Sequence, residues 1–233
     1  MNASRRTWWP GLLFSAAALT TVGCSQAGYR GFVPAAGDGG YMLVGGPPDL
    51  TSAPPDLAPA YAYPPGPYGN QKGNTIVDVT MAGYRLTPEQ TDAAELEWAK
   101  DIKLGEYHLN KACKCLLITW GASWCTACKQ EQPQLIADVM ADKGFCVLNI
   151  VQEGITRGVD ATRDDVDNWN KTYHQNFYVT QGTRSTKNYW MGYGPTIGLP
   201  FNFIVNPKDM KLAGVVPGYR KDIHTYAMGL CGD

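Results

Sequence analysis

Two cysteines spaced two residues apart, Cys125 and Cys128, carry the clearest chemistry of this 233-residue chain. They follow the apolar run 116–120 and open a helical pattern, so Cys125 is predicted at a helix N-terminus. Unpaired N–H groups and the helix macrodipole there favour a thiolate, which is the nucleophile of disulfide exchange. Cys128 follows within disulfide reach. The spacing indicates a redox pair, although a structural disulfide or half of a metal site also fits it.

A metal site would need more ligands, and Cys113 and Cys115 are the nearest further thiols in the sequence. Cys115 enters the predicted strand 116–120, whereas Cys125 follows its far end, about 30 Å away in an extended chain. The three histidines show no ligand spacing. We therefore expect no metal site.

The remaining cysteines leave their pairing open. Cys113 and Cys115 are expected to be structural, and one of them could pair with Cys231 or with Cys146. A buried, unpaired Cys146 is an equal alternative. Six cysteines allow fifteen complete pairings, so the sequence does not choose among them.

The predicted elements place the cysteine pair at a strand-to-helix junction. Their order includes a βαβ unit with a parallel crossover, then a hairpin and a covering helix, which predicts an α/β fold with a central mixed sheet sandwiched by helices. The expected elements are a strand at 76–79, a helix at 87–100, a strand at 116–120, a helix at 125–142 kinked at Pro133, a strand at 145–151, a helix at 164–173, strands at 201–205 and 211–216, and a helix from 221.

Three blocks of sequence resemble thioredoxin-fold proteins of the TlpA/ResA type. WGASWCTACKQEQP at 120–133 resembles their active-site segment, and VLNIVQEG from Val147 resembles their second core strand. GLPFNFIVNPKDMKLAGVVPGY from Gly198 resembles their cis-proline hairpin. The resemblance covers roughly residues 74–233. It implies a thioredoxin-like fold and a thiol-disulfide oxidoreductase that acts on protein thiols and disulfides. No diffusible cofactor is expected, because the electrons reside in the thiols.

The resemblance also implies roles for individual residues. Cys125 would attack the substrate, and Cys128 would resolve the mixed disulfide. Thioredoxins carry a buried aspartate six residues before the first cysteine, where this chain has Thr119. Glu131 is therefore the expected proton-transfer group.

Substrate binding is expected at Trp124 and at Leu199 and Pro200, which would be joined by a cis peptide bond. Thr126 and Ala127, between the two thiols, should set the direction of electron flow, which the sequence leaves open.

Other functions of the same fold remain as alternatives. A peroxide-reducing enzyme would need Thr or Ser three residues before its cysteine, where Ala122 stands. A copper-handling protein would usually space its cysteines by three and supply a histidine. A lipoprotein with a structural or binding role and reduced catalytic activity is the third alternative.

The N-terminal region predicts export and a lipid anchor. Arg5 and Arg6 precede a short apolar run at 11–19, as in a secretory signal. The following TVGC resembles a lipobox, so residues 1–23 are predicted to be a lipoprotein signal peptide and Cys24 to be acylated and membrane-anchored. Ser25 resembles the outer-membrane sorting pattern. The expected location is the cell envelope, on the periplasmic side of the outer membrane.

Composition separates a tether from a domain. Residues 24–72 are rich in proline and glycine and predict a disordered tether, with a thioredoxin-like domain at 73–233. The net charge of −1 gives no reason to expect nucleic acid as a partner.

Overall fold

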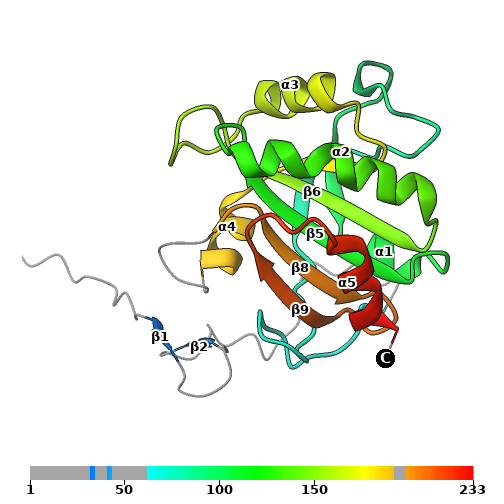
Figure 1. Cartoon of the computed structure of the whole chain (residues 1–233), viewed down its shortest axis with the longest axis vertical. Coiled ribbons are helices and arrows are strands. Elements are labelled where there is room, and N and C mark those ends of the chain that lie inside the picture. Colours follow the sequence, from blue (N-terminus) through cyan, green and yellow to red (C-terminus); the bar gives the residue numbers. More distant parts are fainter. Residues whose placement is uncertain (1–31, 35–40, 44–61, 192–197, 233) are drawn as a thin grey trace, which may run out of the picture. The chain divides into compact units, whose positions relative to one another are not determined.

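The computed structural model describes residues 32–34, 41–43, 62–191 and 198–232 (Figure 1). The predicted signal peptide, Cys24 and most of the predicted tether lie outside these residues. Strands β1 (Phe32–Pro34) and β2 (Tyr41–Leu43) pair antiparallel with each other. Among the described residues, no helix is long and apolar enough to cross a bilayer.

A seven-stranded mixed sheet forms the centre of the domain, in the order β4-β3-β7-β6-β5-β8-β9 (Figure 1). Strands β5, β6 and β7 run parallel, while β8 and β3 pair antiparallel with their inner neighbours. The strands are β3 (Thr80–Tyr84), β4 (Ala99–Lys103), β5 (Cys115–Ala122), β6 (Phe145–Glu153), β7 (Tyr178–Gln181), β8 (Phe201–Asn206) and β9 (Lys211–Pro217).

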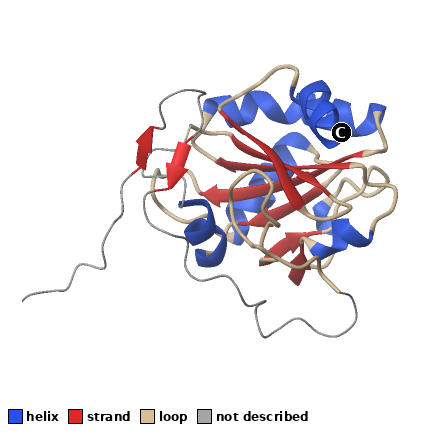
Figure 2. Cartoon of the chain, turned by 90° about the horizontal axis from the view of Figure 1, so that it is seen from below, coloured by secondary structure: helices blue, strands red, loops and turns tan. Residues whose placement is uncertain are grey.

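Helices cover both faces of this sheet (Figure 2). Their bounds are α1 (Gly105–Leu109), α2 (Thr126–Ala141), α3 (Arg163–Tyr173), α4 (Arg184–Met191) and α5 (Ile223–Cys231). The parallel β5-α2-β6 unit, the β8-β9 hairpin and the closing helix α5 reproduce the predicted arrangement, so the thioredoxin-like α/β fold is confirmed.

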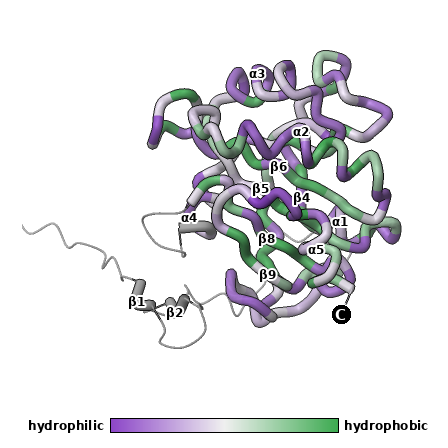
Figure 3. The backbone as a smooth tube through the Cα atoms, viewed as in Figure 1, coloured by the Kyte–Doolittle hydropathy of each residue, from purple (hydrophilic) through white to green (hydrophobic). Residues whose placement is uncertain are grey.

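The core explains why the central strands were recognisable from sequence. All eight residues of β5 are buried, because helices pack on both of its faces. Leu117 contributes to the cluster beneath α2 and α5, whereas Leu116 and Ile118 pack in the cluster on the opposite face. In Figure 3, hydrophobic residues, coloured green, follow the central strands. The apolar runs of β5 and β6 are therefore the interior of the domain.

Capping residues define where the two helices nearest the cysteine pair begin or end. Cys125 is the N-cap of α2, and Pro133 lies inside this helix as predicted. Thr162 caps α3 by a capping box with Asp165, in which each side chain binds the other residue's backbone N–H. His174 ends α3 in the left-handed conformation. These signals agree with the predicted helices at 125–142 and 164–173.

The prediction for residues 76–100 is wrong in two places. The strand lies at β3 rather than at 76–79, and the predicted helix 87–100 contains a turn, a short 3-10 helix η1 (Ala93–Glu95) and the start of β4. Leu86 and Ala93 are buried against the cluster that holds the cysteine pair. Thr87 is a residue type favoured at a helix N-cap and Pro88 one favoured at the first helical position, but tertiary packing overrides this local signal.

Packing of the domain begins before residue 73, so the tether was predicted too long at this end. Tyr63 is buried and donates its hydroxyl hydrogen bond to the carbonyl of Ile76 over 2.9 Å. The hydroxyl of Thr75 donates to the carbonyl of Pro65 over 3.0 Å. Residues 62–72 thus belong to the folded part.

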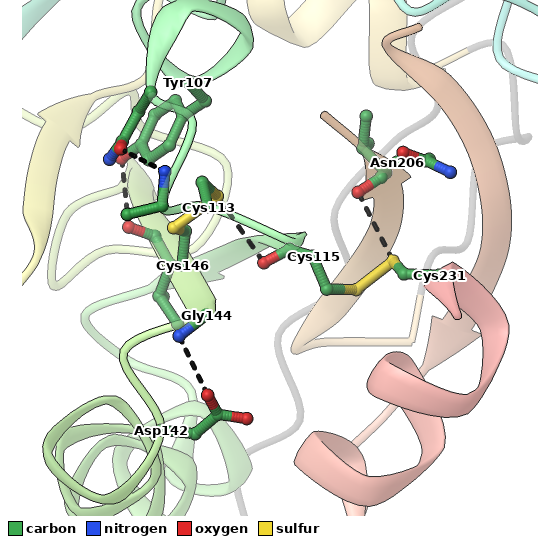
Figure 4. The surroundings of a disulfide bond; sticks show 12 residues. Tyr107, Cys113, Cys115, Asp142, Gly144, Cys146, Asn206 and Cys231 are labelled. Atoms are coloured by element: carbon green, nitrogen blue, oxygen red, sulfur yellow. Dashed lines mark hydrogen bonds between the residues drawn. A yellow bond between two sulfur atoms is a disulfide. The ribbon is translucent and has the colours of Figure 1, made fainter. Parts of the chain in front are cut away.

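Two disulfides answer the open question of the structural cysteines. Cys113 is bonded to Cys146 and Cys115 to Cys231, so Cys146 is not free (Figure 4). Cys113 packs in the cluster on one face of the sheet, and Cys115 packs with α5 on the other. The first bond ties the entrance of β5 to β6, and the second ties β5 to the C-terminal helix.

Candidate redox site

Cys125 and Cys128 form a third disulfide at the carboxyl end of β5, with their Cα atoms 5.3 Å apart. The Sγ of Cys125 accepts a hydrogen bond from the backbone N–H of Cys128 over 3.0 Å. The first sulfur therefore lies at the N-terminus of α2, where sequence reasoning placed it. This position favours a negatively charged sulfur over a neutral thiol.

Both cysteines are packed against apolar side chains. Cys125 is 4% exposed and Cys128 is 1% exposed. Their cluster also contains Val151 of β6 and Val166 and Trp169 of α3. This cluster therefore shields both cysteines almost completely from water, and Cys125 is the more exposed of the two.

Trp124 is positioned by the loop that follows β6. Its Nε1–H donates to the Oε2 of Glu153 over 2.8 Å, and the guanidinium carbon of Arg157 lies 4.4 Å from its ring centroid. The same Glu153 oxygen accepts the backbone N–H of Gly158 over 2.8 Å. A carboxylate and a cation thus hold the indole beside Cys125.

Leu199 and Pro200 are joined by a cis peptide bond, as expected. Pro200 is buried, and its carbonyl accepts the backbone N–H of Gly218 over 2.6 Å. Leu199 packs against the cluster that contains both cysteines, and so does Trp124. The structure therefore brings Cys125, Cys128, Trp124 and Leu199 into one cluster.

Glu131 is fully buried on α2, one turn beyond Cys128. Its Oε1 accepts a hydrogen bond from the Nδ2 of Asn202 over 2.8 Å, and its Oε2 accepts one from the Oγ1 of Thr119 over 2.9 Å. Burial raises the pKa of Glu131 to about 7, against the two hydrogen bonds, which lower it. This carboxyl can take up or release a proton at neutral pH.

Sequence reasoning missed Asn202 as a partner of Glu131. Thr119 and Asn202 face each other in the register of β5 and β8, and Asn149 lies beside Thr119 on β6. This polar row crosses an otherwise apolar sheet beneath α2. A polar residue inside each apolar run was the available signal, because buried polar side chains require partners.

A second set of buried amides holds the first turn of α2. The Nε2 of Gln132 donates to the carbonyl of Cys128 over 3.2 Å. Its Oε1 accepts from the Nε2 of Gln175 over 2.6 Å and from the Nδ2 of Asn149 over 3.4 Å. These bonds fix the backbone that carries the second sulfur.

The structure keeps the other thiols away from this site. Cys113 and Cys115 lie at the opposite end of β5 and are engaged in their own disulfides. Within the described part of the chain, no group of three or more His, Cys, Asp or Glu side chains is arranged to hold a metal ion.

Comparisons give similarities in structure only. No family model matches the chain, and no curated protein matches it. The thioredoxin domain of a thiol-disulfide oxidoreductase from Bacteroides vulgatus is 15% identical, with 70% of this chain and 99% of that chain covered and a TM-score of 0.47. The exposed lipoprotein thioredoxin of Streptococcus pneumoniae strain TIGR4 is 21% identical, with 66% and 98% covered and a TM-score of 0.47.

A third solved structure is a thiol:disulfide interchange protein of the thioredoxin family from Chlorobium tepidum TLS. It is 20% identical, with 66% of this chain and 99% of that chain covered and a TM-score of 0.44. At these identities and TM-scores the similarities carry no argument about activity.

Proposed function

We propose that this chain is a thiol-disulfide oxidoreductase that works through Cys125 and Cys128. The observation that carries the proposal is the disulfide at the start of α2, in which the first sulfur accepts a helix N-terminal N–H. A helix N-terminus stabilises the thiolate that forms when the pair is reduced. It thereby makes Cys125 both a good nucleophile and a good leaving group.

The cycle exchanges one pair of electrons between two disulfides. The thiolate of Cys125 attacks one sulfur of the substrate disulfide, forming a mixed disulfide and releasing the other substrate sulfur as a thiolate that takes up a proton. The thiolate of Cys128 then attacks the Sγ of Cys125 and releases the second substrate thiolate. The substrate gains two electrons and two protons, and the protein ends in the disulfide form seen here. Every step reverses when the substrate is the dithiol.

Glu131 serves as the proton acceptor for Cys128 in this scheme. The carboxyl lies one helical turn from Cys128 in a dry environment, and its pKa of about 7 allows both charge states at neutral pH. Thr119 and Asn202 hold the two carboxyl oxygens in fixed positions.

The substrates are proposed to be protein thiols and disulfides. Trp124 and Leu199 pack against the cluster that contains both sulfurs, and Leu199 is joined to Pro200 by the cis peptide bond. Both residues offer mainly apolar surface, and the two charged groups at Trp124, Glu153 and Arg157, are engaged with the indole. Such a surface favours an apolar protein segment over a small, highly charged molecule.

The protein is proposed to act outside the cytoplasm, anchored through an acylated Cys24 on the periplasmic side of the outer membrane. The support is the N-terminal signal pattern, together with three disulfides among the described cysteines, since such bonds persist in oxidising compartments. Incorporation of labelled fatty acid into the wild-type chain and into Cys24→Ser tests the anchor. Equal labelling of the two would contradict it.

The activity is tested with bis(2-hydroxyethyl) disulfide, a small uncharged substrate, and the reduced full-length chain. We expect exchange by the wild type and none by Cys125→Ser. The variant Cys128→Ser should accumulate a mixed disulfide with the substrate, which mass spectrometry detects. Equal rates for the wild type and Cys125→Ser would overturn the proposed function.

A further inference from the structure

We propose that the loop between β6 and α3, residues 154–162, is the recognition surface for protein substrates, and that it selects segments bearing an apolar side chain and a carboxylate beside the reacting cysteine. This inference rests on the proposed function and adds a substrate class to it. We call these residues the β6–α3 loop.

The β6–α3 loop is fastened to the residues that lead into the redox pair. The backbone N–H of Ser123 donates to the carbonyl of Glu153 over 2.9 Å. Arg157 lies over the ring of Trp124, whose indole N–H binds Glu153. In Figure 1 this loop projects beside the start of α2. A protein segment bound at Cys125 would therefore lie within reach of this loop.

Internal hydrogen bonds give the loop one shape before any partner binds. The N–H of Gly154 donates to the carbonyl of Val159 over 3.0 Å, and the N–H of Val159 donates to the carbonyl of Thr156 over 3.1 Å. Gly158 has a φ of 80°, which a glycine adopts readily, and its N–H is held by Glu153. A preorganised loop loses little conformational entropy when it binds.

The loop exposes apolar side chains beside the site. Ile155 is 76% exposed and Val159 is 54% exposed. Among the large apolar residues that are exposed in the described part of the chain, Ile155 has the highest exposure. Their branched side chains have few rotamers to lose, so covering them stabilises a complex at a low entropic cost.

Arg157 gives the surface its charge preference. In the described part of the chain, no ion pair involves this guanidinium. Two carboxylates close to it in sequence are engaged elsewhere, since Glu153 binds Trp124 and Gly158, and Asp160 pairs with Lys187 over 3.0 Å. An incoming carboxylate can therefore pair with Arg157 without displacing a partner.

The test uses two disulfide-linked peptides that differ only beside the cysteine, one with Asp and Leu and the other with Lys and Ser. Bis(2-hydroxyethyl) disulfide is the third substrate. The reduced full-length wild type should react about ten-fold faster with the Asp-Leu peptide than with the Lys-Ser peptide. Arg157→Met should lose most of this preference, measured as the ratio of the two peptide rates because Arg157 also packs on Trp124. The double variant Ile155→Ser with Val159→Ser should also lose most of it and keep the rate on the small disulfide within about two-fold.

Matched control variants separate this surface from a general effect of charge or apolar exposure. Met140→Ser removes an apolar side chain of similar exposure (55%) on α2, and Lys208→Met removes an exposed cation in the β8-β9 turn. Both controls should retain the wild-type preference between the two peptides.

The possible outcomes distinguish failure of the proposed recognition surface from failure of the proposed oxidoreductase function. A wild type that fails on the small disulfide contradicts the proposed function. A wild type that reduces the small disulfide but treats both peptides alike overturns the recognition surface. Loop variants that slow all three substrates equally also overturn it, because the loop would then act by positioning Trp124 and not by recognising the partner.

Discussion

Asn202 on β8 donates its side-chain N–H to Glu131 on α2 over 2.8 Å. Asn202 follows Pro200 by two residues and Glu131 follows Cys128 by three, so one hydrogen bond links the cis-proline turn to the redox helix. The carboxyl is also held by Thr119. The proton acceptor of the proposed mechanism is thus tuned by residues on two strands.

Replacing Asn202 by Leu should raise the pKa of Glu131 further above about 7. Burial already favours the protonated carboxyl, and the hydrogen bond from Asn202 is the larger of the two contributions that oppose it. The pH at which the disulfide-closing step reaches half its maximal rate should move upward. Stopped-flow measurement of closure between pH 5 and 9 checks this. Asn206→Leu, on the same strand, should leave the profile unchanged, and an unshifted profile in Asn202→Leu would contradict the role of Asn202.

Glu131 should make the disulfide form less stable as pH rises from about 4.5 to about 7. Its carboxyl has a pKa of about 7 when folded and an ordinary value of 4.5 when unfolded, so the folded state holds the proton longer. The stabilising contribution is complete below pH 4.5 and is lost as pH passes 7. Glu131→Gln should therefore gain about 3 kcal/mol relative to the wild type across this window.

Urea unfolding at several pH values measures this difference, with Glu97→Gln, an exposed position, as the control. A constant difference between Glu131→Gln and the wild type from pH 4.5 to 8 would show that the buried carboxyl does not titrate in this range.

The two structural disulfides should differ in their contribution to stability. The Cys115–Cys231 bond spans 116 residues and the Cys113–Cys146 bond spans 33. A longer closed loop removes more entropy from the unfolded chain, which gives about 5 kcal/mol for the first bond and about 4 kcal/mol for the second. Double alanine variants of each pair, unfolded in guanidinium without reductant, measure the two losses. A larger loss for the shorter loop would contradict this entropic explanation.

Gly121→Ala should shift the redox equilibrium of the working pair. A Cβ at Gly121 would lie 3.2 Å from the Sγ and 3.3 Å from the Cβ of Cys128, closer than ordinary contact. Crowding the disulfide form should raise the reduction potential by about 20 mV, or roughly 1 kcal/mol. Equilibration with a dithiol buffer measures the potential. Gly229→Ala, where a Cβ would have no neighbour within 4 Å, is the matched control.

The parts of the fold that were predictable are those in which burial alone determines the element. Strands β5 and β6 are covered on both faces, so their apolar runs are continuous and unambiguous. Edge strand β4 buries only Ile102, and its polar residues resemble an exposed helix. Its conformation depends on pairing with β3, which local sequence does not encode. Short β7 and the short helices α1 and α4 gave too few residues for any periodic pattern.

The candidate site likewise contains residues that the local sequence predicts and residues that only the folded chain brings together. Cys125, Cys128 and Glu131 lie in one helical segment, and their spacing could be read directly. Asn202 reaches Glu131 only because β8 pairs with β5, and that pairing joins residues 83 positions apart in the register Thr119 to Asn202. Arg157 reaches Trp124 through a loop conformation that only the folded chain defines.

Strand β5 keeps the Cys125–Cys128 pair apart from the two structural disulfides. Strand β5 is eight residues long, from the cross-linked Cys115 to Ala122, and spans about 26 Å. Sulfur exchange requires the two sulfurs to touch, so no electron pair passes from Cys125 and Cys128 to the other two bonds. In the proposed mechanism the described part of the protein therefore exchanges one electron pair, at Cys125 and Cys128, while its other four cysteines remain in two structural disulfides.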